Sequence, residues 1–296
     1  MTTKKANFLL MLISIGWGTS YLFMKIGIEE MGAYAITFWR FIIAFLVVGM
    51  IFHKQLLQVN RKTLTYSAVS GVILFGVFIT IIYGMETTDI STAGFLVSTT
   101  VVLVPILQAI YTRTWPLRNV VIGVIIVTVG LALMTMKGNS ISLSMGAWLC
   151  LATAFFNALY IVATKQFVRE VQTLQFGMYQ LLFTALYGGI GMVVIEGVEV
   201  PGAGMQWIAI LGLALICSAF GFVVQPVAQK YTTAESAGFI FSFEPIFAAI
   251  FAYVFVGEVI SMQGYLGAGL ILFGVFVANF ERRRAVEKRG KLVREI

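Results

Sequence analysis

Long apolar runs alternate with short polar segments along the whole chain. Each run has about 20 residues, the length that an α-helix needs to cross roughly 30 Å of hydrocarbon. The runs are continuous and about twice as long as a barrel strand, so they do not fit the period-two pattern of a β-barrel. We predict an all-α polytopic membrane protein with ten transmembrane helices, over residues 6–26, 34–52, 65–83, 91–111, 120–136, 145–164, 174–195, 205–227, 236–256 and 262–280.

The composition supports a lipid environment. Of the 296 residues, 59% are hydrophobic and 11% are charged, and the mean hydropathy is +0.95. One water-soluble core cannot hold that much apolar side chain, so lipid must solvate most of the chain. The net charge of +7 comes from short basic clusters between the runs, so we expect no nucleic-acid partner. Cys150 and Cys217 lie inside apolar runs, and we expect no disulfide, metal or other cofactor.

The distribution of cations predicts the orientation of the helices. With ten spans, nearly all Lys and Arg residues between runs fall on one side, whereas the other side carries Lys137 and most of the acidic residues. Because Lys and Arg are retained on the cytoplasmic side, both termini should be cytoplasmic and the protein should lie in the cytoplasmic membrane. The first run is too long for a cleavable signal and should remain as a helix. We interpret residues 281–296 as a basic cytoplasmic tail rather than a lipid-binding switch.

An internal echo divides the chain into two halves. Residues 91–96 read Ser-Thr-Ala-Gly-Phe-Leu, and residues 235–240 read Glu-Ser-Ala-Gly-Phe-Ile. A weaker echo places Arg40 opposite Gln180. Five helices per half is an odd number, so the halves should have opposite topology, as in many secondary transporters. We predict a first five-helix repeat over 1–138, a second over 139–280 and the tail over 281–296.

Several motifs resemble those of the drug/metabolite transporter superfamily, in particular its ten-helix EamA-type permeases. They are Trp17-Gly18-Thr19-Ser20 with Lys25, Arg40 followed by Ala44, and Glu244-Pro245 leading to Gly257-Glu258. The resemblance covers nearly the whole chain and implies two inverted repeats around a central cavity, with transport, often export, of amino acids or other metabolites. The first repeat has Val101 where the second has Pro245, and its own proline is displaced to Pro105. We therefore expect the two halves to be kinked differently.

Glu244 is the strongest single candidate for function. A carboxylate near the middle of a span is costly in hydrocarbon and must face protein, water or a partner. Two roles follow, a proton-binding site for coupling or a counter-ion for an amine on the substrate. The alternative is a structural hydrogen bond to a neighbouring helix beside the bend at Pro245. We predict that Glu244 binds substrate and carries the coupled proton.

Arg40 is the second candidate, several residues into the second span. Its guanidinium could recognise a carboxylate on the substrate. The alternative is a structural role, in which Arg40 pairs with Glu29, Glu30 or nearby carbonyl groups. The sequence leaves both interpretations open.

Other polar and aromatic residues within the spans should turn inward because lipid offers no hydrogen-bond partner. The further candidates for substrate binding are Trp17, Tyr21, Ser98, Asn157, Tyr160, Gln225 and Ser242. Their alternative role is packing or hydrogen bonding between helices. Three prolines in or at the ends of spans, Pro105, Pro226 and Pro245, are candidate hinges for conformational change, with static packing as the alternative.

Missing motifs narrow the function. The chain has no G-x-x-x-x-G-K-[ST] phosphate loop, so a gradient should drive transport. His53, the only histidine, falls in a predicted loop, and no G-x-S-x-G motif occurs, so we expect no enzyme and no catalytic residues. We predict a secondary transporter that moves a small organic metabolite by alternating access, with an amino acid, a related zwitterion or an amine favoured and export favoured. Its expected partners are the substrate and the bilayer, with protons as a further candidate. Lipid flippases and structural membrane subunits are the alternatives.

Overall fold

Helices account for almost all of the computed structural model, which describes residues 1–113, 118–137, 140–141, 144–202 and 204–292. The elements are α1 (Thr3–Gly27), α2 (Ala33–Ile51), α3 (His53–Leu56), α4 (Arg61–Glu86), α5 (Ile90–Ser98), α6 (Thr100–Thr112), α7 (Arg118–Thr135), β1 (Met136–Lys137), β2 (Ser140–Ile141), α8 (Met145–Phe167), α9 (Thr173–Gly191), the π-helical η1 (Met192–Glu196), α10 (Met205–Gly212), the π-helical η2 (Leu213–Phe220), α11 (Gly221–Gln229), α12 (Ala234–Phe241), α13 (Glu244–Phe251), the π-helical η3 (Ala252–Val256) and α14 (Met262–Leu292). In this part of the chain the strands are limited to one antiparallel pair, β1 with β2. Side chains of residues 134–143, of Glu235 and of residues beyond Ala278 lie outside the described set.

Local sequence sets the start of several helices. A side-chain oxygen at the N-cap accepts a bond from a backbone N–H of the first turn, which would otherwise lack a partner. The residues that do this are Thr2, Asn60, Ser144 and Thr233.

The helices have the length and surface of membrane spans. In the described residues, 8 helical segments are long and apolar enough to cross a membrane: α1, α2, α4, α5–α6, α8, α9–η1, α10–η2–α11 and α12–α13–η3. Shorter apolar stretches lie in α7 (Arg118–Leu133) and α14 (Met262–Ala278). Large apolar side chains remain exposed on the outside of the bundle, including Leu46, Val72, Ile125 and Phe273. The prediction of an all-helical polytopic membrane protein is confirmed, and the count of ten spans stays a prediction.

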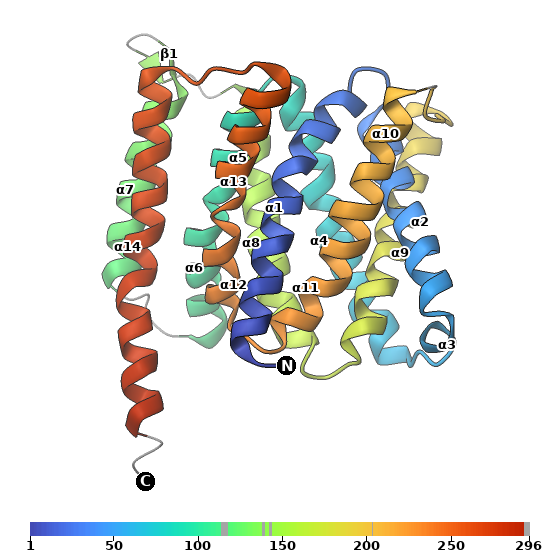
Figure 1. Cartoon of the computed structure of the whole chain (residues 1–296), viewed down its shortest axis with the longest axis horizontal. Helices are drawn as coiled ribbons and strands as arrows, with labels where there is room; N and C mark the ends of the chain where they lie inside the picture. Colours follow the sequence, from blue (N-terminus) through green and yellow to red (C-terminus); the bar gives the residue numbers. More distant parts are fainter. Residues whose placement is uncertain (114–117, 138–139, 142–143, 203, 293–296) are drawn as a thin grey trace.

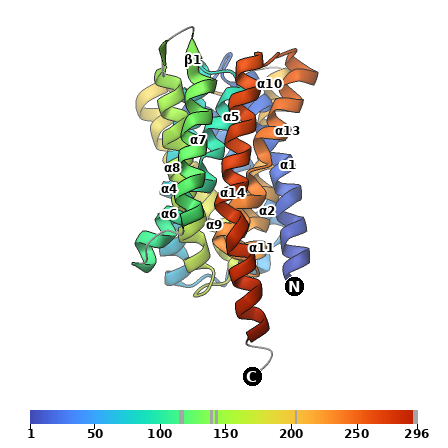
Figure 2. The same ribbon diagram turned by 90° about the vertical axis from the view of Figure 1, so that its left-hand side faces the viewer.

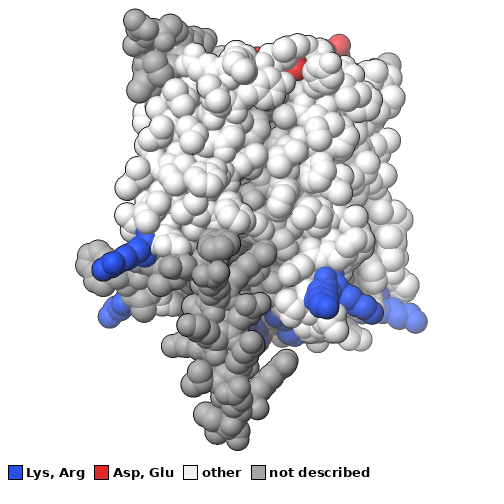
Figure 3. Space-filling view, turned by 60° about the vertical axis from the view of Figure 1, so that its left-hand side comes forward, with Lys and Arg blue, Asp and Glu red and all other residues white. Residues whose placement is uncertain are grey.

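Charges separate along the bundle. Both described ends of the chain lie at the same end of the molecule (Figure 1). Lys and Arg side chains gather at that end, and Asp and Glu side chains appear at the opposite edge, with an uncharged band between them (Figure 3). This is the pattern expected from cytoplasmic retention of cations, although which end faces the cytoplasm stays a prediction. The side chains of Lys137 and of the predicted tail lie outside the described residues, while the α14 backbone continues to Leu292.

The two halves of the chain pack against each other reciprocally. Helix α1 contacts α12 and α13, and in return α8 contacts α5 and α6. Helices α7 and α14 form a pair at one flank (Figures 1 and 2). Glycines permit this close pairing, because a Cβ on Gly123 would lie 2.6 Å from the Cβ of Ala278. These contacts are those that two related five-helix units would make, while the boundaries of the repeats stay a prediction.

The fourth helix of each half is broken at an equivalent point. Helix α5 ends at Ser98 and α12 ends at Phe241, just before Ser242. The Ser98 hydroxyl donates to the carbonyl of Phe95 over 2.6 Å, and the Ser242 hydroxyl donates to that of Phe239 over the same distance. The break covers Thr99 in the first half and Ser242 and Phe243 in the second. Whether the two halves are kinked differently stays a prediction. Serine, which bonds back to its own helix in both halves, marks the break independently of where the proline lies.

The three candidate hinge prolines have different surroundings. Pro245 lies in the first turn of α13, directly after the break, whereas Pro105 and Pro226 lie inside α6 and α11, which continue past them. A proline inside a helix leaves the carbonyl four residues earlier without its N–H partner. For Pro226 that carbonyl belongs to Phe222, and the side-chain amide of Gln180 donates to it over 2.6 Å. Whether any of the three acts as a hinge stays a prediction.

Candidate functional site

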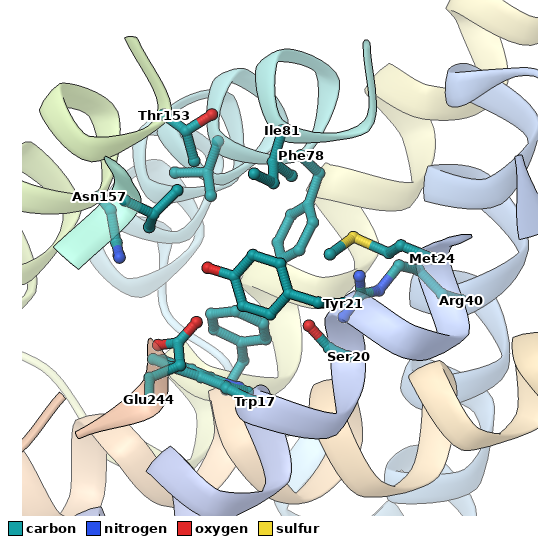
Figure 4. Close-up of a pocket in the computed structure, with 13 residues that line it drawn as sticks. Trp17, Ser20, Tyr21, Met24, Arg40, Phe78, Ile81, Thr153, Asn157 and Glu244 are labelled. Carbon is teal, nitrogen blue, oxygen red and sulfur yellow. The ribbon is translucent and has the colours of Figure 1, made fainter. Parts of the chain in front are cut away.

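A cavity lies inside the bundle, between helices from both halves. Figure 4 shows the side chains that surround it. They come from α1, α2, α4, α5, α8, α11 and α13, and they are Trp17, Ser20, Tyr21, Met24, Arg40, Val77, Phe78, Ile81, Val97, Thr153, Asn157, Phe222 and Glu244. Most of this lining is apolar, and the charged side chains in it are Arg40 and Glu244.

Helix α1 contributes one face to the cavity. Trp17, Ser20, Tyr21 and Met24 are three or four residues apart, so they fall on one side of the helix. The Trp17 indole N–H donates to the carbonyl of Cys217 over 3.0 Å, which fixes the orientation of the ring. The resulting surface combines two aromatic rings with the hydroxyls of Ser20 and Tyr21, which suits a small organic ligand.

Gly18 brings this face of α1 close to the helix that carries Glu244. A Cβ at this position would lie 2.5 Å from the Cβ of Phe247 and 3.1 Å from the backbone nitrogen of Ala248, both in α13. Only glycine allows the two backbones to approach this closely. The Trp17-Gly18-Thr19-Ser20 motif therefore places an aromatic ring and a hydroxyl at the cavity while its glycine holds α13 against α1.

Glu244 occupies the first position of α13, immediately after the helix break. Its side chain is 8% exposed and lines the cavity together with Tyr21. Asn157 of α8 lines the same part of the cavity. The break thus turns a carboxylate inward at the junction of α1, α8 and α13, where it faces protein groups and a hollow.

Arg40 is completely buried in α2 on the other side of the cavity. Its Nε donates to the Ser218 hydroxyl over 3.0 Å, and its guanidinium carbon lies 4.2 Å from the centre of the Phe78 ring. Glu30, one of the two expected partners, instead accepts a bond from the side chain of Gln206. Among the described residues the ion pair found is Lys62 with Glu170, so no described carboxylate pairs with Arg40.

A second, smaller cavity adjoins the first. The two share Val97, Asn157 and Glu244. Ser98 and Thr100, which flank the break between α5 and α6, line the second cavity. Glu244 and Asn157 therefore stand between two compartments, one bounded by α1, α2 and α4 and the other by the two helix breaks.

Three predicted binding residues lie elsewhere. The Tyr160 hydroxyl donates to the side-chain oxygen of Gln180 over 3.2 Å, and the Gln225 amide donates to the side-chain oxygen of Gln229 over 3.4 Å. The Ser242 hydroxyl bonds within its own helix. None of the three lines either of these two cavities, and their roles as ligands stay predictions. By contrast, Glu244, Arg40, Trp17, Tyr21 and Asn157 come together at the first cavity, and Ser98 at the second.

Other residues that line the first cavity were not predicted from the sequence. Ser20 and Met24 share a helix face with Trp17 and Tyr21, so helical spacing alone could have found them. Thr153 stands one turn before Asn157 in α8 and is detectable in the same way. Phe78 carries no such signal, because an apolar residue in an apolar run can equally well face lipid.

Comparison with known proteins decides the family. The sequence pattern of the EamA-like transporter family matches residues 4–136 and again residues 144–280. The chain belongs to the EamA-like transporter family. It is thus a multi-pass membrane protein of a transporter family, and the resemblance to the drug/metabolite transporter superfamily is confirmed.

This EamA-like transporter is similar to several proteins over nearly its full length. An uncharacterized transporter of Archaeoglobus fulgidus is 25% identical over 95% of this chain and 99% of that protein. The uncharacterized transporter YetK of Bacillus subtilis is 23% identical over 90% of this chain and 84% of that protein. A probable terminal-alkyne amino-acid exporter of Streptantibioticus cattleyicolor is 23% identical over 98% of this chain and all of that protein (100%). A crystal structure with 18% identity covers 95% of this chain and 99% of its own with a TM-score of 0.73, which supports the fold.

Proposed function

We propose that this EamA-like transporter exports a small apolar amino acid, or a related zwitterion or amine, across the cytoplasmic membrane by alternating access. The observation that carries the proposal is the position of Glu244, a buried carboxylate that lines a cavity inside a membrane-spanning bundle. An anionic group at such a depth suits an ammonium group or a proton. The apolar remainder of the lining suits an apolar side chain.

The relative from Streptantibioticus cattleyicolor supports the choice of substrate class. Its name assigns it an amino acid with a terminal-alkyne side chain and the direction of export. Such a side chain is small and apolar, as is the space beside Phe78 and Ile81 in this cavity. The similarity of 23% extends over 98% of this chain and supports the proposal.

Proton coupling would follow from competition at Glu244. A proton and an ammonium group cannot both neutralise the same carboxylate at once, so binding of one releases the other. The Tyr21 hydroxyl lines the same cavity and would be the donor to the ionised form between the two events. Exchange of one substrate for one proton would then be electrically balanced for a cation.

The direct test uses purified protein in liposomes with an imposed pH gradient. Radiolabelled L-leucine and L-propargylglycine, which bears a terminal alkyne, serve as probes. Wild type should move at least one of them at a rate that depends on the gradient, and Glu244→Gln should abolish that dependence. Glu86→Gln is the matched control, because Glu86 is an exposed carboxylate at the end of α4. Full transport by Glu244→Gln with unchanged pH dependence would refute the role of Glu244.

The same experiment separates the alternative functions. A flippase would move labelled lipid between leaflets, an enzyme would convert the probe, and a structural subunit would move nothing.

The orientation has its own test. Single cysteines at exposed positions such as Lys54 should react with a membrane-impermeant thiol reagent only from the cytoplasmic side. Reaction from outside intact cells would overturn the proposed topology.

A further inference from the structure

Arg40 is a buried cation whose hydrogen bonds are only partly satisfied. Its side chain is completely buried, and one of its terminal nitrogens, Nη1, has no hydrogen-bond partner. Burying a guanidinium is costly unless a carboxylate and further hydrogen bonds compensate. The bond to Ser218 and the faces of Phe41 and Phe78 compensate only in part, because no described carboxylate pairs with Arg40.

The other half of the protein shows that packing does not require this charge. Gln180 is the eighth residue of α9, as Arg40 is the eighth residue of α2. Its amide oxygen accepts from Ser70 over 2.9 Å and from Tyr160 over 3.2 Å, and its nitrogen donates to the carbonyl of Phe222. A neutral amide therefore bridges neighbouring helices at this position with both ends bonded. The arginine adds a charge and a free donor to the equivalent place.

The Arg40 side chain borders the cavity. Arg40 lines it together with Ser20, Tyr21 and Met24, and Figure 4 shows the guanidinium extending among these side chains. Glu244 lies on the opposite side, with Tyr21 and Trp17 between them. The cavity thus has a cationic pole and an anionic pole joined by aromatic surface.

We propose that Arg40 binds the carboxylate of the transported solute through its free Nη1, so that the solute lies across the cavity with its ammonium group toward Glu244. This inference rests on the proposed function and specifies its substrate as a molecule that carries both charges. Guanidinium is suited to this task, since it presents several N–H donors in one plane and pairs with carboxylates in a fixed geometry. An α-amino acid and an amino acid with distant charged groups both have this chemistry.

The experiment measures binding of four matched compounds to the purified full chain by isothermal titration calorimetry. They are L-leucine with both charges on one carbon, 6-aminohexanoate with the charges far apart, isopentylamine with the cation alone, and 4-methylpentanoate with the anion alone. Wild type should bind one of the two zwitterions at least tenfold more tightly than isopentylamine, because a charge-assisted bond to a carboxylate is worth at least that factor. Which zwitterion binds more tightly identifies the spacing.

Two variants locate the effect. Arg40→Gln, which copies the residue at the equivalent place in α9, should reduce zwitterion affinity at least tenfold and leave isopentylamine affinity unchanged. Arg40→Lys should retain part of the preference, since it keeps the charge and loses the planar geometry. Lys62→Gln removes one exposed cation at the start of α4 and should change neither affinity.

The outcomes separate the two proposals. If no compound binds wild type or is transported in liposomes, the proposed substrate class fails. If wild type binds isopentylamine as tightly as both zwitterions, or if Arg40→Gln keeps the full preference, the carboxylate site is refuted while amine transport stands. The comparison of the four compounds on wild type decides the question even if Arg40→Gln does not fold.

Discussion

The contact between α1 and α13 provides a sharp test of the packing around the cavity. Gly18→Ala adds one methyl group at a place where its carbon would lie 2.5 Å from the Cβ of Phe247. Carbon atoms in favourable contact are about 3.5–4.0 Å apart, so the two helices must separate by about 1 Å or tilt. Neither contact atom can move alone, because one is a Cβ and the other is the backbone nitrogen of Ala248.

The expected magnitude follows from two opposing effects. Overpacking of a tight core costs about 1–3 kcal/mol. Alanine in place of glycine within a helix returns about 0.5–1 kcal/mol through reduced backbone entropy of the unfolded state. The net loss should be about 1 kcal/mol, and each kcal/mol lowers the melting temperature by about 2–4 °C in a chain of this size. The transport rate should also fall, because Trp17 and Glu244 lie on the two helices that are displaced.

Thermal unfolding in detergent measures the stability, and Gly269→Ala is the matched control. Gly269 is also a helical glycine, but a Cβ there would have no atom within 4 Å. This control should be neutral or slightly stabilising. If Gly18→Ala matches Gly269→Ala in both melting temperature and transport, the close approach of α1 and α13 is not a constraint on the protein and the reasoning is refuted.

Two further changes test electrostatic contacts at opposite ends of the bundle. Glu258 accepts hydrogen bonds from the backbone N–H groups of Ile90 and Ser91 at the start of α5. Glu258→Gln should therefore destabilise the protein by about 1–2 kcal/mol and speed hydrogen exchange of the α5 amides. Unchanged exchange would contradict the contact. At the other end, a hydrogen bond from Lys62 lowers the pKa of Glu170 below its ordinary value of 4.5. Because the folded-state pKa is the lower one, this contribution is present above pH 4.5 and is lost as the pH falls through the folded-state value. Glu170→Gln should therefore slightly reduce the loss of stability at acidic pH, and the effect should be small because the pair is exposed. An unchanged dependence of stability on acidic pH would show that the pair contributes nothing.

Much of the architecture could be predicted from hydrophobicity alone. The predicted span over 145–164 corresponds to α8, which begins at Met145 and ends at Phe167. Hydrophobicity could not predict the two helix breaks, because a break depends on where the backbone hydrogen bonds go. Ser98 and Ser242 bond back to their own helices, and nothing in the apolar pattern distinguishes them from serines that bond across helices.

The candidate site could be predicted for charged residues, which cannot face lipid and must lie in the interior of the bundle. A carboxylate at Glu244 and a guanidinium at Arg40 are too costly in lipid, so both had to turn inward, and both reach the cavity. Neutral polar residues had more options. Tyr160 and Gln225 found side-chain partners away from the cavity, and only the tertiary structure shows which partner each of them has.

The placement of the two charges bears on how such a carrier could work. Thr100 is the first residue after the break in the first half, as Glu244 is in the second, and Gln180 stands where Arg40 does. Each charge therefore occurs in one half and is replaced by a neutral residue in the other, whereas the serines at the breaks are common to both. Under alternating access the two halves exchange shapes, which requires the bending points to be alike. The binding groups need not be alike in the two halves, and one cation with one anion can fix the orientation of the solute. A solute held between one cation and one anion keeps the same orientation in both conformations, so the protein need not turn it during transport.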